Sequence, residues 1–257
     1  SYGIPNQLLG RIGNFVNFGI LKGARFLVTG HTGFKGAWLS RLLNRYEAEV
    51  SGIGLEPERN SILSKTNGIK FSSSFLFDIA DPIMVRKAVE KVNPEVIIHM
   101  AAQPLVRRSF REPVKTFMTN VMGTAHVLEA ARFVEDLKGV IVVTSDKVYK
   151  NVENERGYEE EDMLGGKDPY SASKSASEMV VNAWQTISKL NLNFPIVSAR
   201  SGNIIGGGDH SEDRLLPDLI RSFRENKVAK IRNPHSLRPW QHVLDPLHGY
   251  LRIATAI

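Results

Sequence analysis

Two residues on one predicted helix have side chains suited to acid–base chemistry. Tyr170 and Lys174 lie four positions apart in a segment with helical periodicity, so both project from the same helix face. A cation beside a phenol stabilises the phenolate, and we expect it to lower the pKa of Tyr170 from the usual value of about 10. Tyr170 could then exchange a proton with a sugar or alcohol hydroxyl. The alternative is a chance spacing on a surface helix.

A second stretch with chemical potential is Thr144-Ser-Asp-Lys147, which directly follows a β-branched segment typical of a buried parallel strand. Ser145 is a candidate hydrogen-bond partner for the Tyr170 hydroxyl. A hydrolase nucleophile is the alternative for Ser145, but its neighbours lack the glycines of a nucleophile elbow and a partner histidine. The stretch therefore favours proton transfer over nucleophilic attack.

A glycine-rich turn lies upstream of both stretches. It follows a short apolar strand, residues 25–29, and leads into an apolar, periodic segment, residues 34–46. Gly30 suits a tight turn, Gly33 the close approach of a pyrophosphate, and Gly36 the packing of helix on strand. Strand, glycine turn and helix in this order predict a dinucleotide-binding turn, whereas the glycines alone would equally fit an ordinary loop.

Strands and helices alternate from residue 22 onward. The predicted strands are residues 25–29, 50–55, 74–78, 94–100, 139–144 and 194–199. The predicted helices are residues 34–46, 81–92, 113–135, 171–189 and 215–224. This alternation predicts an α/β fold, a Rossmann-like doubly wound parallel sheet. Ligands of such folds lie at the carboxyl ends of the strands, where the glycine turn and the Thr144 stretch also fall.

The pattern divides the chain into three regions. Residues 1–22 are predicted to be an N-terminal tail or interface arm, and residues 23–200 a dinucleotide-binding domain. The alternation ends beyond Gly206-Gly-Gly208, and residues 201–257 are predicted to form a partial substrate-binding lobe.

Composition and charge exclude several classes of protein. The chain has no cysteine, so disulfides and thiolate chemistry are excluded, which fits a cytoplasmic location. The histidine spacing matches no metal site, and no apolar run approaches the roughly 18 residues of a membrane span. The net charge of +6 would suit nucleic acid, but the charges are dispersed and the densest run, Glu159 to Asp162, is acidic. We expect small phosphorylated ligands, with no metal, membrane or nucleic acid.

Several stretches together make the sequence similar to the extended short-chain dehydrogenase/reductase family, and within it to the nucleotide-sugar 4,6-dehydratases. The matching stretches are Thr29 to Gly36, His99 to Pro104, Asn120 to Thr124, Thr144 to Lys147, Gly165 to Lys174, Gly202 to Asp209, and Arg232 to His242. The resemblance covers residues 22–257 and implies NAD as a tightly bound, regenerated cofactor and CDP-glucose as substrate. Compared with the family, the substrate lobe is C-terminally truncated.

The resemblance also implies a role for each catalytic residue. Tyr170 would take the proton of the sugar 4-hydroxyl while hydride leaves C4. Asp146 would protonate the departing 6-hydroxyl and Lys147 would remove the C5 proton, and hydride return to C6 would give CDP-4-keto-6-deoxyglucose. Lysine is a base only when neutral, so we expect Lys174 and partial burial to lower the pKa of Lys147. The alternative for Lys147 is a salt-bridging lysine at a strand end.

Further residues follow from the family pattern. Glu56, about 20 residues beyond the glycine turn, would bind the ribose 2′-hydroxyl and repel a 2′-phosphate, which favours NAD over NADP, while Arg59 is a solvated loop charge. The residues implied around NAD are Gly30, Thr32, Gly33, Phe34, Lys35, Gly36, Asp78, Ile79, Ala101, Ala102, Gln103, Tyr170 and Lys174. Those implied around the nucleotide-sugar are Gln103, Asn120, Asn203, Arg214, Arg232, Arg238 and His242. Guanidinium groups suit bidentate phosphate contacts.

Two other functions stay open at the level of sequence. A nucleotide-sugar 4-epimerase needs only Tyr170, Ser145 and NAD, and leaves Asp146 and Lys147 as spectators. A truncated homologue could bind NAD and turn nothing over. Because related enzymes dimerise through a helix bundle, we expect a homo-oligomer formed by the helix at 113–135 and the helix that carries Tyr170.

Overall fold

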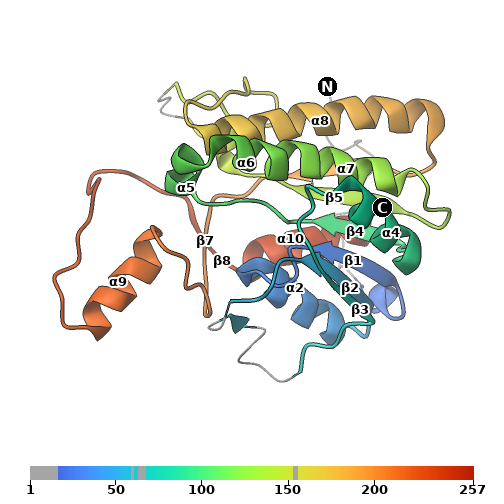
Figure 1. The fold of residues 1–257 in the computed structure, drawn as a ribbon, viewed down its shortest axis with the longest axis horizontal. Coiled ribbons are helices and arrows are strands. Elements are labelled where there is room, and N and C mark those ends of the chain that lie inside the picture. Colours follow the sequence, from blue (N-terminus) through green and yellow to red (C-terminus); the bar gives the residue numbers. More distant parts are fainter. Residues whose placement is uncertain (1–16, 59–60, 63–67, 153–155) are drawn as a thin grey trace.

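The computed structural model describes residues 17–58, 61–62, 68–152 and 156–257. A six-stranded parallel sheet forms its centre (Figure 1), in the order β3-β2-β1-β4-β5-β6. This order is that of a dinucleotide-binding doubly wound sheet and confirms the predicted fold class. The strands are β1 (Arg25–Thr29), β2 (Glu49–Gly54), β3 (Ser73–Leu76), β4 (Val96–His99), β5 (Gly139–Val143) and β6 (Ile196–Ala199).

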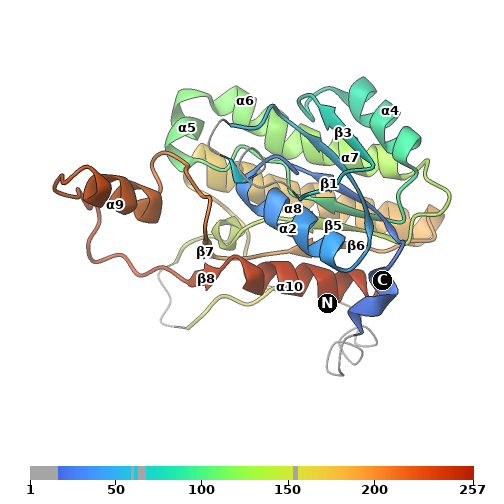
Figure 2. The same ribbon diagram turned by 90° about the horizontal axis from the view of Figure 1, so that it is seen from below.

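Helices cover both faces of the sheet. One face carries α4 (Pro82–Val92), α6 (Pro113–Phe117), α7 (Gly123–Ala131) and α8 (Pro169–Asn191) (Figure 1). The other carries α2 (Phe34–Arg45) and α10 (Leu244–Ala254), which lie nearest the viewer in Figure 2. Successive strand residues alternate between the two sides: Leu27 packs with the first group, and Phe26 and Val28 pack with the second. The central strands β1, β4 and β5 are thus buried on both faces, as the apolar composition of residues 94–100 and 139–144 predicted.

The helix predicted at 113–135 differs from the structure. It is divided into α6, a π-helical turn η2 (Met118–Met122), and α7, which ends at Ala131. The Asn120 carbonyl accepts hydrogen bonds from the hydroxyls of Thr124 at 2.6 Å and Ser177 at 2.8 Å, which satisfy it inside the widened turn. The apolar spacing continues on both sides of this turn and therefore did not reveal it.

Most of the remaining segments follow the carboxyl ends of the strands, whereas η1 precedes the start of β1. Short helices η1 (Phe18–Leu21), α5 (Val106–Arg111) and η3 (Asp146–Val148) were not predicted. Strands β7 (Asn203–Ile205) and β8 (Trp240–His242) form a parallel pair, and α9 (Leu215–Arg224) lies apart from the sheet (Figure 1). None of the described helices is long and apolar enough to span a membrane.

The division of the chain into three regions stays a prediction. Of the predicted tail, residues 1–16 lie outside the described part, and Leu21 of η1 is buried in the core. Helix α10 belongs by sequence to the predicted substrate lobe, yet Leu247 and Leu251 pack into the core beneath the sheet.

Candidate active site

The glycine turn joins β1 to α2 by close backbone contacts. Gly30 has φ +74°, and a Cβ there would lie 2.9 Å from the Ala101 nitrogen at the end of β4. A Cβ on Gly36 would lie 2.0 Å from the Gly30 carbonyl oxygen, so only glycine lets α2 start this close to β1. Gly33, by contrast, would meet the same oxygen at an ordinary 3.4 Å.

The first turn of α2 has the properties of an anion site. Its N-cap is Gly33, which offers no side chain to the backbone N–H groups that a helix leaves unsatisfied at its start. Burial, together with the charges of Lys174 and Arg214, lowers the pKa of Lys35 in this turn to about 7. A half-buried lysine that is partly neutral would regain its charge beside a bound anion. The turn therefore fits the pyrophosphate of a dinucleotide.

The other predicted cofactor residues follow the ends of β2, β3 and β4. Glu56 is exposed two residues beyond β2, and Arg59 lies outside the described part of the chain. Asp78 accepts a hydrogen bond from the Ala80 N–H, and Ile79 is buried against Gly123. Thr32 lies in the glycine turn, Phe34 is the first residue of α2, and half-buried Ala101 and Ala102 follow β4.

The Thr144 stretch forms a small polar cluster at the end of β5. Ser145 caps η3, accepting from the Lys147 N–H at 3.2 Å and donating to the Asp146 carboxylate at 3.0 Å. The Lys147 ammonium donates to Asp146 at 2.9 Å and to Asn203 at 3.1 Å. The expected neighbour of Lys147 was Lys174, but the groups in contact are a carboxylate and an amide oxygen. These contacts are those of the salt-bridging lysine that was the alternative for Lys147.

Tyr170 is buried at the start of α8. Burial raises its pKa, while a hydrogen bond with Ser145 and the charge of Arg214 act in the opposite direction. The net direction is opposite to the one predicted from its spacing to Lys174, because the spacing carries no information about desolvation. The Lys174 ammonium instead donates to the Val143 carbonyl at 3.3 Å, and burial lowers the pKa of Lys174 to about 8.

The side-chain amides of Gln103 and Asn120 form hydrogen bonds with other groups of the protein. Asn120 accepts from the Gln103 N–H at 2.8 Å and donates to its carbonyl at 3.2 Å. The side-chain amide of Gln103 bonds to Leu105 and Thr116. Both residues were predicted to bind substrate, but these hydrogen bonds position the loop after β4 and the turn η2.

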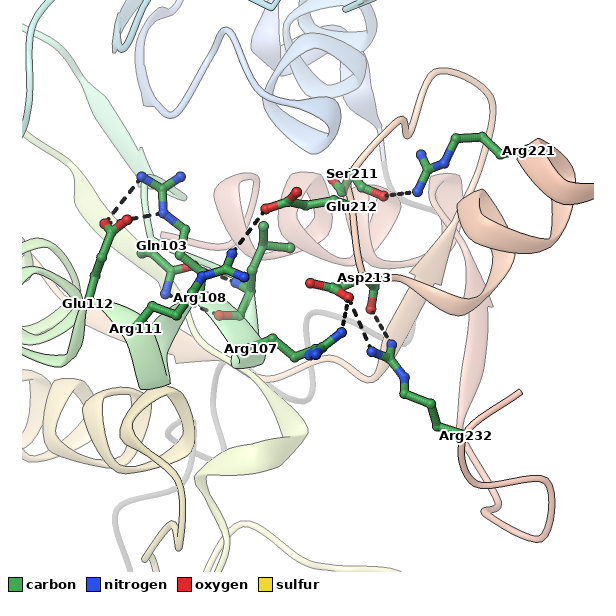
Figure 3. Close-up of polar contacts among 11 residues, drawn as sticks. Gln103, Arg107, Arg108, Arg111, Glu112, Ser211, Glu212, Asp213, Arg221 and Arg232 are labelled. Carbon is green, nitrogen blue, oxygen red and sulfur yellow. Dashed lines mark hydrogen bonds and ion pairs between the residues drawn. The ribbon is translucent and has the colours of Figure 1, made fainter. Parts of the chain in front are cut away.

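The predicted arginines differ in their surroundings. Arg214 pairs with Asp209 at 3.0 Å, and its charge acts on both Lys35 and Tyr170. Arg232 is exposed and pairs with Asp213 at 3.1 Å (Figure 3). Arg238 is exposed and donates to the Leu237 carbonyl. The structure thus brings Arg214, among these three, close to the acid–base residues.

Asp213 also contacts a second arginine that the sequence did not single out. Arg107 of α5 pairs with the Asp213 carboxylate at 2.7 Å, opposite Arg232 (Figure 3). Arg111 of the same helix reaches Glu212 at 3.4 Å. These ion pairs connect α5 with the segment before α9. His242 is exposed, and its Nδ1 accepts from the Leu244 N–H at 3.3 Å.

Glu178 is a further polar residue that the sequence analysis missed. It lies on α8, four residues after Lys174, and is fully buried. Its carboxylate pairs with Arg200 at 3.0 Å and accepts from the hydroxyl of Thr144. The signal was present, since Tyr170, Lys174 and Glu178 repeat at intervals of four residues along one helix face.

Comparison with known proteins identifies the class to which this fold and site belong. The chain belongs to the NAD dependent epimerase/dehydratase family, because the sequence model of that family matches residues 26–257. NAD is the cofactor of that family. The CDP-glucose 4,6-dehydratase of Salmonella typhimurium is 46% identical over 239 residues, which are 91% of this chain and 67% of that protein.

Other relatives and solved structures are similar to this chain at lower sequence identity. A probable dTDP-glucose 4,6-dehydratase of Sinorhizobium fredii is 31% identical over 86% of this chain and 65% of its own length. A dTDP-glucose 4,6-dehydratase of Streptomyces venezuelae, solved with NAD bound, has a TM-score of 0.78 at 24% identity, covering 90% of this chain and 72% of its own. An epimerase of Methanothermobacter thermautotrophicus has a TM-score of 0.81 at 22% identity, covering 96% and 71%. This chain thus spans about two thirds of the curated relatives named here.

Proposed function

We propose that this protein is an NAD-dependent nucleotide-sugar 4,6-dehydratase that converts CDP-glucose to CDP-4-keto-6-deoxyglucose. The observation that carries the proposal is the Ser145-Asp146-Lys147 cluster at the end of β5, hydrogen-bonded through Ser145 to Tyr170. An epimerase needs the Tyr170–Ser145 pair alone, whereas elimination needs a further acid and base. The identity of 46% to a CDP-glucose 4,6-dehydratase supports the same substrate.

The residues present fit NAD. The uncapped start of α2 and the narrow Gly30–Gly36 turn suit a pyrophosphate, and Glu56 follows β2 where a carboxylate binds the ribose 2′-hydroxyl. Asp78, Ile79, Ala101 and Ala102 would line the remaining length of the cofactor. NAD, when bound, supplies a hydride acceptor that later returns the hydride.

Tyr170 and Ser145 handle the proton of the sugar 4-hydroxyl. The single hydroxyl proton of Ser145 is donated to Asp146 in the structure. Turned toward the Tyr170 oxygen instead, this proton would stabilise the phenolate. Because burial raises the pKa of Tyr170, its phenolate depends on Ser145 and on neighbouring cations. Arg214 supplies such a charge, and Lys174, four residues along α8, is the candidate for a second.

Asp146 and Lys147 perform the elimination of water. The carboxyl group of Asp146 delivers a proton to the departing 6-hydroxyl, and Lys147 accepts the C5 proton. In the structure, Lys147 shares its ammonium protons with Asp146 and Asn203. Transfer of one proton from the Lys147 ammonium to the Asp146 carboxylate would leave a neutral amine beside a carboxylic acid. The elimination requires these two forms.

The substrate diphosphate is placed by Arg214. This residue stands at the start of α9, and its charge reaches both Lys35 and Tyr170. Arg232 and Arg238, both exposed, and His242 are the further candidates for nucleotide contacts.

A homo-oligomer completes the proposal. Exposed apolar side chains lie along α6, η2 and α8, which are adjacent on the outer side of the sheet (Figure 1). They are Val114 at 75%, Phe117 at 39%, Met118 at 42%, Met122 at 43% and Met179 at 60% exposure. A second copy could cover this surface through a helix bundle.

Mass spectrometry of product formation tests the proposed substrate. CDP-glucose, dTDP-glucose and GDP-mannose are offered side by side to the purified protein with added NAD. We expect CDP-glucose alone to give a product lighter by one water, without net consumption of NAD. Preferential dehydration of another nucleotide-sugar would overturn the substrate assignment, and NAD binding without any product would overturn the activity.

A further inference from the structure

Glu178 makes several buried hydrogen bonds, and the proposed reaction assigns it no role. Its two carboxylate oxygens accept hydrogen bonds from Thr144, from Ser198 at 2.9 Å, and from two nitrogens of Arg200 at 3.1 and 3.0 Å. Thr144 follows β5, Ser198 lies in β6 and Arg200 directly follows β6. The carboxylate on α8 therefore ties the helix that carries Tyr170 to the ends of two strands.

This contact set is buried. The side chain of Glu178 is 1% exposed and that of Arg200 is 18% exposed. An ion pair removed from water to this degree is costly unless its remaining donors and acceptors are also satisfied. Hydrogen bonds, those from Arg200 foremost, hold the pKa of Glu178 below its usual range despite burial. Glu178 thus carries a fixed negative charge inside the protein.

Arg200 extends these contacts outward to the long loop after β5. It donates to the Tyr149 hydroxyl at 3.0 Å and to the Glu160 carbonyl at 2.9 Å. Tyr149 in turn stacks on Tyr158, and the centroids of the two rings lie 4.9 Å apart. The loop that borders Lys147 is thereby anchored to α8 through the same ion pair.

The fixed charge also lies one helical turn from Lys174. The titratable groups that act on this lysine, or on which it acts, are Lys35 of α2, His99 of β4 and Glu178 of α8. Lys35 and Lys174 repel each other, and His99 is held neutral by burial, so Glu178 is the anion of this group. Its charge favours the protonated form of Lys174.

We propose that Glu178 is a positioning residue for the reaction: its buried carboxylate fixes Thr144, and with it Ser145, against the helix that carries Tyr170, and its charge keeps Lys174 an ammonium ion. The kinetic part rests on the proposed dehydratase function, whereas the effect on Lys174 does not. A purely structural role would stabilise the fold and leave the titration of Lys174 unchanged.

The first test measures the titration of Lys174 without any substrate. Competitive acetylation with acetic anhydride across a pH series, read peptide by peptide in a mass spectrometer, gives the midpoint for this lysine. In Glu178→Gln we expect the midpoint to fall by roughly one pH unit. The matched control is Glu95→Gln, which removes a carboxylate paired with Lys138 and Arg25 at the opposite end of the sheet. A midpoint that falls equally in both variants, or in neither, overturns the proposal.

The second test separates positioning from charge. Thr144→Val removes the hydroxyl donor and leaves the Glu178–Arg200 ion pair in place. We expect kcat to fall roughly tenfold or more with KM within about twofold, and the Lys174 midpoint to stay unchanged. Glu178→Gln should also move the alkaline limit of kcat to lower pH. Wild-type kcat in Thr144→Val overturns the proposal.

The two tests remain decisive if one variant or the activity fails. If circular dichroism shows that Glu178→Gln is unfolded, Thr144→Val alone decides. If the wild-type protein dehydrates no nucleotide-sugar, the proposed function fails, while the acetylation series still decides whether Glu178 controls Lys174.

Discussion

Burial decides the ionisation of the residues around Tyr170. It lowers the pKa of His99 to about 3, of Lys35 to about 7 and of Lys174 to about 8, and it raises the pKa of Tyr170. Each group is pushed toward its neutral form, so bound anions can restore charge to the lysines. The sequence indicated the pairing of Tyr170 with Lys174 through their spacing, but desolvation depends on what packs around them and was not predictable.

Proton uptake on NAD binding follows from the lowered pKa of Lys35. The pyrophosphate would raise this pKa, so binding takes up protons above about pH 7, and the affinity for NAD falls as pH rises through that range. Calorimetry in two buffers of different ionisation enthalpy measures the uptake. Lys35→Met should reduce the uptake, and the exposed control Lys22→Met should not. Binding without proton exchange near pH 8 would show that Lys35 does not meet the anion.

Asp146→Asn separates a dehydratase from an epimerase. Loss of the acid should lower dehydration by roughly 10²–10⁴-fold while oxidation at C4 continues, so the absorbance of reduced NAD accumulates after mixing with CDP-glucose. Stopped-flow absorbance and product analysis follow the two steps. Asp136→Asn, an exposed acid paired with Arg25 at the other end of the sheet, should behave as wild type. Unimpaired turnover in Asp146→Asn would make Asp146 a spectator.

At the scale of the elements, the unit of strand, glycine turn and helix was readable because each part carries a local signal. Helix α10 was not predicted, because its apolar residues pack against β1 and β4, which lie far away in the sequence. The turn η2 was missed for the same reason, because the partners of Asn120 come from the loop after β4 and from α8. Long-range contacts of this kind leave no periodicity in the sequence.

Alanine substitutions at two glycines of the turn should affect different properties of the protein. Gly36→Ala places a Cβ 2.0 Å from the Gly30 oxygen, and this overpacking should lower the free energy of unfolding by about 1–3 kcal/mol. Gly33→Ala meets the same atom at 3.4 Å, so it should keep its stability and lose NAD affinity through the obstructed approach of the pyrophosphate. Thermal unfolding and NAD titration of both variants provide the comparison. Equal stability of the two variants would refute the packing argument.

For the whole molecule, the exposed apolar surface on α6, η2 and α8 predicts association. Val114→Asp places a charge in the proposed interface and should give monomers in sedimentation velocity, with wild-type stability of the fold. Ile83→Asp, at 65% exposure on α4, is the matched control and should leave the assembly unchanged. A wild-type protein that sediments as a monomer at all concentrations would contradict the proposed interface.

In the proposed reaction, one sugar molecule gives a hydride to the protein-bound cofactor and receives it back after losing water. CDP-glucose that carries deuterium at C4 follows this hydride, with mass spectrometry and NMR of the product. We predict a product lighter by one water, with the deuterium at C6. Deuterium that remains at C4 in a product of unchanged mass, or that accumulates in reduced NAD, would contradict the account.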